Sequence, residues 1–308
     1  MESIIRTEHL TKHYGKFHAL NNVSISIKKG EIYGFLGLNG AGKTTTILLL
    51  LGIIRPTSGA SFLYGKKVSA GNNRLWKNVG YLLERQYSYP ELTASENLEV
   101  IRHLRNISDR KSIDTIITRL KLDPYKEVRA KNLSLGNAQR LGLAKALLHN
   151  PDILILDEPA NGLDPAGIVE IRELLKGLAF IHGVTIFISS HILEEISRLA
   201  TRIGIIHQGT LIQEIDTNEL ENLCKKRLLI DADNKEAVRL KLLENGFSVN
   251  LSEEGLLEVK GNDAIKHPEN IANILVYAGI PPKLLKVAEE NLESYFLRII
   301  GVNGGNVK

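Results

Sequence analysis

The stretch Glu31–Thr45, EIYGFLGLNGAGKTT, decides the fold of this chain. It fits the pattern G-x-x-x-x-G-K-[ST], with Gly37, Gly42, Lys43 and Thr44 at the fixed places. Glycines at this spacing let the backbone curl until several N–H groups point at one phosphate, while the lysine adds a cation and the threonine hydroxyl can ligate Mg²⁺. The loop follows an apolar run and opens another, which predicts strand, loop and helix. The segment therefore predicts an α/β domain that binds phosphate.

The residues of this loop are the first candidate binding site. A glycine turn with a purely structural role is the alternative, but a loop between a buried strand and a helix is the context that the phosphate-binding motif requires. We expect the phosphates of a nucleotide to contact Asn39, Gly40, Ala41, Gly42, Lys43, Thr44 and Thr45.

A second acidic segment, Ile153–Pro159 (ILILDEP), complements the loop. Asp157 ends an apolar strand and is placed to hold the shell of a Mg²⁺ ion, together with Thr44. Glu158 beside it can polarise a water for attack on a γ-phosphate. An Asp-Glu pair after a strand often marks only the N-cap of a helix. Its presence in the same α/β region as a phosphate loop favours the catalytic interpretation.

Outside these two segments, the spacing of apolar residues predicts the secondary structure of the first two thirds of the chain. Residues 3–9 and 22–28 alternate apolar and polar side chains, which predicts an antiparallel β layer. From about 95 to 148 the pattern is helical, and Thr93 with Glu96 resembles a capping box. From 153 to 206 short apolar strands alternate with helices, which predicts a parallel sheet covered by helices.

Past about Leu220 the pattern changes to β-α-β-β-α-β with a closing helix, the split βαβ order, and it carries no catalytic motif. We therefore expect a nucleotide-binding domain over 1–220 with a helical subdomain over about 85–150. A small α+β accessory domain would follow over 221–300, and 301–308 would be a disordered tail. The accessory domain could serve dimerisation, which we favour slightly, or regulation, bracing of the first domain, or contact with a membrane partner.

Composition excludes several classes of protein. Apolar residues make up 43% and charged residues 24%, as in folded globular proteins, and the net charge of +4 does not by itself indicate nucleic acid. The single cysteine excludes an internal disulfide framework. No apolar run approaches the roughly 20 residues that a membrane span needs, and the N-terminus shows no signal peptide. We expect no membrane span, so any pore that the chain serves would lie in another polypeptide.

Between the two phosphate-site segments lies Leu133–Arg140, LSLGNAQR. It resembles the signature of ABC (ATP-binding cassette) transporter ATP-binding subunits, whose usual form is Leu-Ser-Gly-Gly-Gln, and Q-R-x-x-x-A-x-A-L follows as in that family. Other matches come in the family's order. Tyr14 matches the aromatic that stacks on adenine, Asn161–Pro165 matches the D-loop, and His191 matches the switch histidine that contacts the γ-phosphate.

This resemblance implies a fold and a mode of action. The fold would be the P-loop NTPase cassette, with a mixed sheet core, an antiparallel β layer and a helical subdomain. ATP and Mg²⁺ would be the cofactors, with Lys43, Glu158 and His191 as catalytic residues. Ser134 and Gly136 would bind the nucleotide held by a second copy of the chain. The partner would be an integral-membrane permease, and the chain would be cytoplasmic, peripheral on the inner face of the cell membrane.

Two departures from the family pattern indicate which subfamily the chain resembles. The signature has Leu135 where glycine is usual, and Glu84 stands where the family places a glutamine that senses Mg²⁺ and the membrane subunit. Glu84 could serve as a Mg²⁺ ligand in the same role or could alter the coupling of hydrolysis to transport. The two departures resemble the subfamily that exports peptide antibiotics, the bacitracin-resistance and lantibiotic-immunity ATP-binding subunits.

A different class of function remains as the alternative, a soluble ABC ATPase that acts on ribosomes or DNA. Members of the ribosome class usually carry two cassettes, and this chain has one set of motifs. Members of the DNA class place a long coiled coil between phosphate loop and signature, for which there is no room here. We therefore expect no nucleic acid partner.

Overall fold

The computed structural model describes residues 3–69, 75–83, 87–252 and 255–301. The chain divides into two compact units, Met1–Asn218 and Glu219–Lys308, called the first and second unit below. Each unit has a hydrophobic core of its own. Two of the predicted features, Glu84 and the tail from residue 302 onward, lie outside the described residues.

A six-stranded sheet forms the centre of the first unit. Its strands, in order across the sheet, are β11 (Thr210–Asp216), β10 (Arg202–His207), β4 (Ile32–Leu36), β9 (Thr185–Ser190), β8 (Ile153–Asp157) and β7 (Val79–Leu82). All neighbouring pairs are parallel except β10 with β11. Every residue of β4, β8 and β9 is buried, as expected of apolar runs covered on both faces. The predicted mixed sheet is confirmed.

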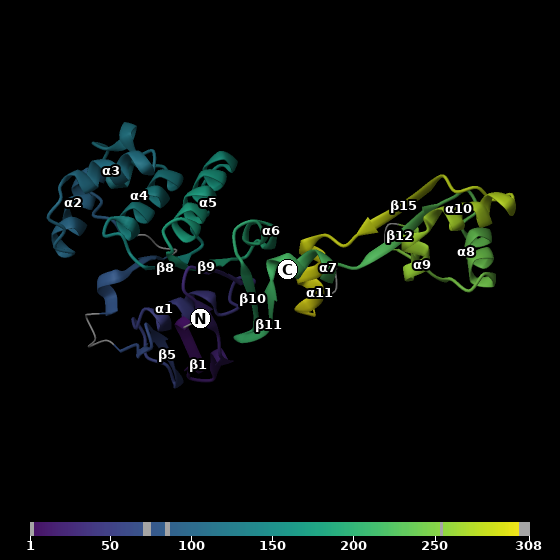
Figure 1. Ribbon diagram of the computed structural model, residues 1–308, viewed down its shortest axis with the longest axis horizontal. Helices are drawn as coiled ribbons and strands as arrows, with labels where there is room; N and C mark the ends of the chain where they lie inside the picture. The colour runs from purple at the N-terminus through teal and green to yellow at the C-terminus, as the bar shows by residue number, and fades with distance from the viewer. Residues whose placement is uncertain (1–2, 70–74, 84–86, 253–254, 302–308) are drawn as a thin grey trace. The chain divides into compact units, whose positions relative to one another are not determined.

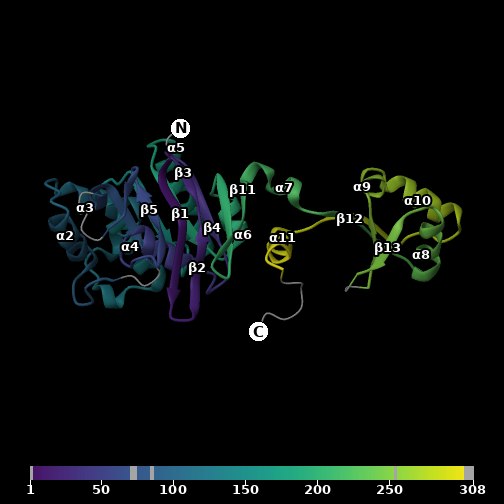
Figure 2. The same cartoon turned by 90° about the horizontal axis from the view of Figure 1, so that it is seen from below.

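An antiparallel layer packs on this sheet, as Figure 2 shows for its purple strands. It consists of β1 (Ser3–Tyr14), β2 (Phe17–Val23), β3 (Ser26–Lys28), β5 (Ser58–Leu63) and β6 (Lys66–Lys67). Ile5 of β1 pairs with Ile27 of β3, which confirms the layer predicted from residues 3–9 and 22–28. These side chains belong to one core with Phe35 and Phe187 of the central sheet.

Helices complete the first unit, and α2, α3 and α4 gather at one side of it (Figure 1). The helices are α1 (Lys43–Leu50), α2 (Ala94–Leu104), α3 (Lys111–Arg119), α4 (Leu135–Leu147), α5 (Pro165–Phe180) and α6 (Leu193–Ser197), with 3-10 turns at η1 (Leu75–Asn78), η2 (Asp123–Tyr125), η3 (Ala130–Asn132) and η4 (Thr217–Glu219). The predicted capping box starts α2. The Glu96 N–H donates to Thr93 Oγ1 at 3.1 Å, and the Thr93 N–H donates to Glu96 Oε2 at 2.7 Å.

The second unit has the predicted split βαβ order. Its elements are α7 (Leu220–Leu223), β12 (Lys226–Asp231), α8 (Lys235–Glu244), β13 (Ser248–Leu251), β14 (Leu257–Lys260), α9 (Asn262–Lys266), α10 (Pro268–Tyr277), β15 (Leu284–Glu289) and α11 (Leu292–Ile299). The sheet order is β13-β14-β12-β15, with antiparallel neighbours, so β14 lies between β12 and β13. Two helices stand where the sequence predicted one, because Pro268 disfavours helical backbone at His267.

Across the residue ranges given above, no helix combines the length and the apolar character that crossing a bilayer requires.

Close packing of β7 under α4 yields a stability prediction. A Cβ on Gly80 would lie 2.2 Å from the Ala146 carbonyl oxygen, a backbone atom that cannot swing away. We expect Gly80→Ala to lower the free energy of unfolding by about 1–3 kcal/mol, as overpacking does. Gly177→Ala is the matched control, since Gly177 lies inside α5 with no atom near its Cβ position. That variant should stabilise the chain by about 0.5–1 kcal/mol. Thermal denaturation measures both, and equal stability of the two variants would contradict the packing.

Candidate functional site

The phosphate loop is shaped by contacts that need glycine. α1 begins at Lys43, directly after Gly42, whose φ is 111°. A Cβ at Gly42 would lie 2.8 Å from the Ala19 carbonyl oxygen, so both conformation and space exclude a side chain there. Lys43 is only 6% exposed, and its ammonium donates to the Gly37 carbonyl oxygen at 2.7 Å. The lysine is thereby held across its own loop.

A pocket of about 610 Å³ opens over this loop, within the usual size range of small-molecule sites. It includes six of the seven predicted phosphate-loop residues, and Ala41 is the exception. The Ala41 carbonyl instead accepts from the Gly209 N–H at 2.9 Å, and its side chain is buried in the core. The pocket is lined by Phe17, Ala19, Leu38, Asn39, Gly40, Gly42, Lys43, Thr44, Thr45, Glu158, Asn161 and His191.

Asp157 lies at the end of β8, fully buried beside the loop. The Thr44 hydroxyl donates to its Oδ2 at 2.8 Å, and the Ser189 hydroxyl donates to its Oδ1 at 2.6 Å. Thr44 and Asp157, predicted as metal ligands from different segments, are therefore in direct contact. Hydroxyl and carboxylate oxygens are the donors that Mg²⁺ prefers, so the residues present fit that ion.

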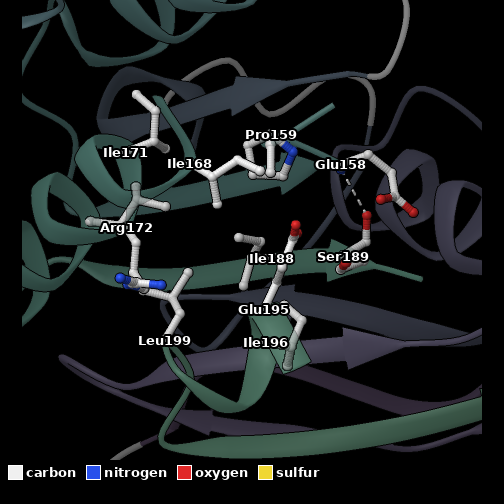
Figure 3. A pocket seen from close by; sticks show the side chains of 13 residues that line it. Glu158, Pro159, Ile168, Ile171, Arg172, Ile188, Ser189, Glu195, Ile196 and Leu199 are labelled. Atoms are coloured by element: carbon white, nitrogen blue, oxygen red, sulfur yellow. Dashed lines mark hydrogen bonds between the residues drawn. The ribbon is translucent and has the colours of Figure 1, made fainter. Parts of the chain in front are cut away.

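The Glu158 carboxylate is held in the pocket by two side chains, one at each of its oxygens. Its Oε1 lies 3.2 Å from the Lys43 ammonium, and its Oε2 lies 2.9 Å from His191 Nδ1. The backbone has φ 49°, a conformation that non-glycine residues rarely adopt, and the Glu158 N–H donates to Ser189 Oγ at 3.1 Å (Figure 3). Strained backbone of this kind occurs preferentially at functional sites. The three residues predicted as catalytic from separate segments thus form one cluster.

The simpler interpretation of the Asp-Glu pair, a helix N-cap, is wrong. α5 begins at Pro165, and its N-cap is Asp164, whose Oδ1 accepts from the Gly167 N–H at 2.9 Å. Asp157 and Glu158 are therefore free for another role.

Ser189 and Gln139 contact the site residues and were not predicted as part of the site. Ser189 bridges Asp157 and the Glu158 backbone. Gln139 of α4 donates to the Glu158 carbonyl oxygen at 3.1 Å, which links the signature helix to the carboxylate cluster. Gln139 lies in the segment LSLGNAQR and Ser189 lies two residues before His191, but their contacts follow from the fold.

The signature residues lie apart from this pocket. Ser134 is the N-cap of α4, and its Oγ accepts from the Asn137 N–H at 3.3 Å. Neither Ser134 nor Gly136 lines the pocket. Leu135 is 70% exposed, yet it packs on Gly162, since a Cβ there would lie 2.4 Å from Leu135 Cγ. The leucine that departs from the family pattern is therefore matched by a glycine in the D-loop.

Tyr14 lies at the end of β1, where it pairs with Phe17 of β2. Phe17 lines the pocket and Tyr14 does not. The ammonium of Lys12 lies 4.8 Å from the centre of the Tyr14 ring. The family resemblance assigned adenine stacking to Tyr14, whereas the aromatic that lines the pocket is Phe17, which was not predicted as a site residue.

The contact between Leu135 and Gly162 can be tested by stability. Gly162 has φ 77°, so Gly162→Ala adds left-handed strain and a clash, and should cost about 1–3 kcal/mol of unfolding free energy. Gly183 has a similar φ of 69° with open space around it, so Gly183→Ala measures the cost of the left-handed strain without a clash. The clash predicts that Leu135→Ala restores part of the stability of Gly162→Ala. Strict additivity in a double-mutant cycle would contradict the contact.

Comparison with known proteins adds to this geometry. A family model described as "ABC transporter" matches residues 20–161. The chain is 40% identical to the bacitracin transport ATP-binding protein BcrA of Bacillus licheniformis, over 100% of both chains. It is 39% identical to the lantibiotic transport ATP-binding protein SrtF of Streptococcus pyogenes, over 71% of this chain and 94% of that one.

A solved structure is similar as well. It is the dimeric structure of a post-hydrolysis state of an ATP-binding cassette bound to ADP and Pi. The identity is 26% and the TM-score 0.65, over 69% of this chain and 98% of that one. The phosphate loop, the buried Asp157 and the held Glu158 agree with these similarities. The chain belongs to the ATP-binding proteins of ABC transporters and is an ATPase.

Proposed function

We propose that the chain powers the export of a peptide antibiotic, of the bacitracin type, through a separate membrane permease, and so confers resistance. The observation that carries this proposal is the similarity to the bacitracin transport protein, which extends over the whole chain and includes the second unit. A cassette alone would account only for residues up to about 218. On this proposal the chain lies in the cytoplasm, on the inner face of the membrane, where the permease holds it.

We propose the following roles at the site. Lys43 and the backbone N–H groups of the loop bind the β- and γ-phosphates of ATP. Thr44 and Asp157 hold Mg²⁺, which supplies positive charge against the phosphate oxygens. Glu158 orients and polarises the attacking water. The role of His191 is to hold the Glu158 carboxylate from one side and to contact the γ-phosphate from the other. Support comes from the contacts of 2.8 to 3.2 Å that join these side chains.

The ion pair of Lys43 with Glu158 matters for this mechanism. A triphosphate in the pocket offers Lys43 a stronger anionic partner than one carboxylate. Glu158 then keeps His191 and loses Lys43, so that one carboxylate oxygen is free to accept a proton from water. Ser189 and Gln139 hold the Glu158 backbone in place during this exchange.

We propose that two copies of the chain close on two ATP molecules. Ser134 and Gly136 begin α4, and the N-terminus of such a helix favours an anion. The two residues do not line the pocket of their own copy, so they are available to the nucleotide of the other. We further propose that the second unit supports this dimer. Exposed apolar side chains on its helices support that role, namely Leu240, Leu243, Val276 and Tyr277.

We propose that the permease docks in a groove lined by Leu83 and Tyr87. A pocket of about 320 Å³ lies there, with exposed apolar side chains that include Ile53, Tyr87 and Leu104. Lys145 of α4 borders the groove and donates to the Tyr87 carbonyl oxygen at 2.5 Å and to Ser88 Oγ at 2.8 Å. Burial lowers the pKa of Lys145 to about 8. The signature helix is thus tied to the segment after Glu84, whose own role we propose as coupling or Mg²⁺ ligation.

The groove predicts a variant that separates docking from hydrolysis. Leu104 is 71% exposed at the end of α2, so Leu104→Glu should leave folding and basal ATP hydrolysis intact. A charge in an apolar interface loses binding, and co-purification with the permease should fall at least tenfold, about 1.4 kcal/mol. Ile181→Glu, at an exposed apolar side chain outside the groove, is the control. Equal permease binding by both variants would place docking elsewhere.

A susceptibility assay tests the proposed function directly. The chain and its permease are expressed in a sensitive bacterium, and the inhibitory concentrations of bacitracin and of a lantibiotic are measured. We expect the inhibitory concentration of bacitracin to rise when the wild-type chain is expressed. It should stay at the baseline with Lys43→Ala, which removes the phosphate-binding cation. A protection that survives Lys43→Ala would refute ATP-driven export. Unchanged susceptibility, together with co-purification of ribosomes or DNA, would favour the non-transport alternative.

A further inference from the structure

A second pocket lies directly behind Glu158, away from the phosphate loop. It has a volume of about 40 Å³ and is walled by α5, by β9 and by α6 with the residues after it (Figure 3). The walls are mostly apolar, with Ile168, Ile171, Leu175, Ile188, Ile196 and Leu199. Close-packed interiors contain few voids larger than a water molecule, so a space of this size beside α6 is uncommon.

Two side chains of opposite charge line this apolar pocket and do not form an ion pair with each other. Glu195 reaches into it from α6, and Arg172 lies at its other side on α5 (Figure 3). Among the described residues Glu195 makes no hydrogen bond or ion pair. In the described part of the chain, the one ion pair of Arg172 is a 3.5 Å contact with Glu173, its neighbour in sequence. Burial raises the pKa of Glu195, while His191 and Arg172 oppose that rise and Glu158 adds to it. A partly buried carboxylate without a partner costs folding free energy.

The position of α6 matters because His191 lies just before it. β9 ends at Ser190 and α6 begins at Leu193, so one residue, Ile192, separates the histidine from the helix. α6 also packs tightly on the sheet, since a Cβ on Gly34 of β4 would lie 2.3 Å from Ile196 Cγ2. The sheet side of α6 is therefore filled, and the open space is on the side of α5.

We propose that Glu195 is a positioning residue for His191, through an ion pair that it forms with Arg172 across this pocket when His191 engages the nucleotide. The pair joins α6 to α5 and holds the histidine against Glu158 and the γ-phosphate during hydrolysis. Attraction between opposite charges is stronger in such an apolar setting than in water. The inference rests on the proposed role of His191.

The test is a double-mutant cycle on the full chain with Glu195→Gln, Arg172→Gln and their combination. Glu194→Gln is the control, because Glu194 is exposed and pairs with Arg198 on the surface at 2.6 Å. Each single variant should lower kcat for ATP about tenfold with KM unchanged, since the pair acts only during hydrolysis. The double variant should lose no more than either single one, because both remove the same pair.

Melting temperatures separate positioning from a structural role. Glu195→Gln removes an unpaired carboxylate from an apolar pocket, so its melting temperature should not fall below that of the wild type. Wild-type kcat in Glu195→Gln, additive losses of about a hundredfold in the double variant, or parallel falls of kcat and melting temperature would each overturn the inference. The proposed function is tested separately by ATP hydrolysis of the wild-type chain, which Lys43→Ala should abolish. A failure of the proposed function can therefore be told apart from a failure of the Glu195–Arg172 pair.

Discussion

The Glu158 carboxylate, held between the Lys43 ammonium and His191, is the interaction on which the rest of the cassette depends. The three residues come from segments far apart in the chain, and the parallel sheet brings them together. β9 lies between β4 and β8, with Leu36 opposite Ser190 and Asp157 opposite Ser189. Because the carboxyl ends of parallel strands lie at one edge, the loops that follow them converge there.

At this edge of the sheet charged side chains are buried, and each of them has a hydrogen-bond or ion-pair partner. Asp157 is fully buried, and hydroxyls of Thr44 and Ser189 satisfy both of its oxygens. Lys43 is tied to a loop carbonyl as well as to Glu158. Such a network is stable only while every member is satisfied. A phosphate ligand therefore rearranges partners that already exist, and the elements behind them, α4 through Gln139 and α6 through His191, sense the change.

The sequence predicted those parts of the molecule whose chemistry is explicit in residue type and spacing. The glycine pattern before Lys43, the apolar strand before Asp157 and the alternation in residues 3–9 indicated elements that the structure contains. Contacts that depend on strand register were not predictable, as Ser189 shows, since a serine in a buried strand has no signature of its own. Phe17 was missed for a similar reason, because the turn of the β1–β2 hairpin decides which aromatic faces the pocket. In the second unit, the break between α9 and α10 follows from one proline.

Glu158→Gln tests directly whether Glu158 activates the attacking water, because it keeps the shape of the side chain and removes its ability to take a proton. Sedimentation velocity with Mg·ATP, combined with phosphate release, reads out both assembly and chemistry in the same variant. We expect an ATP-dependent dimer that persists and a turnover about 100-fold or more below the wild type. Wild-type turnover in that variant would show that another group activates the water and that Glu158 is not the base.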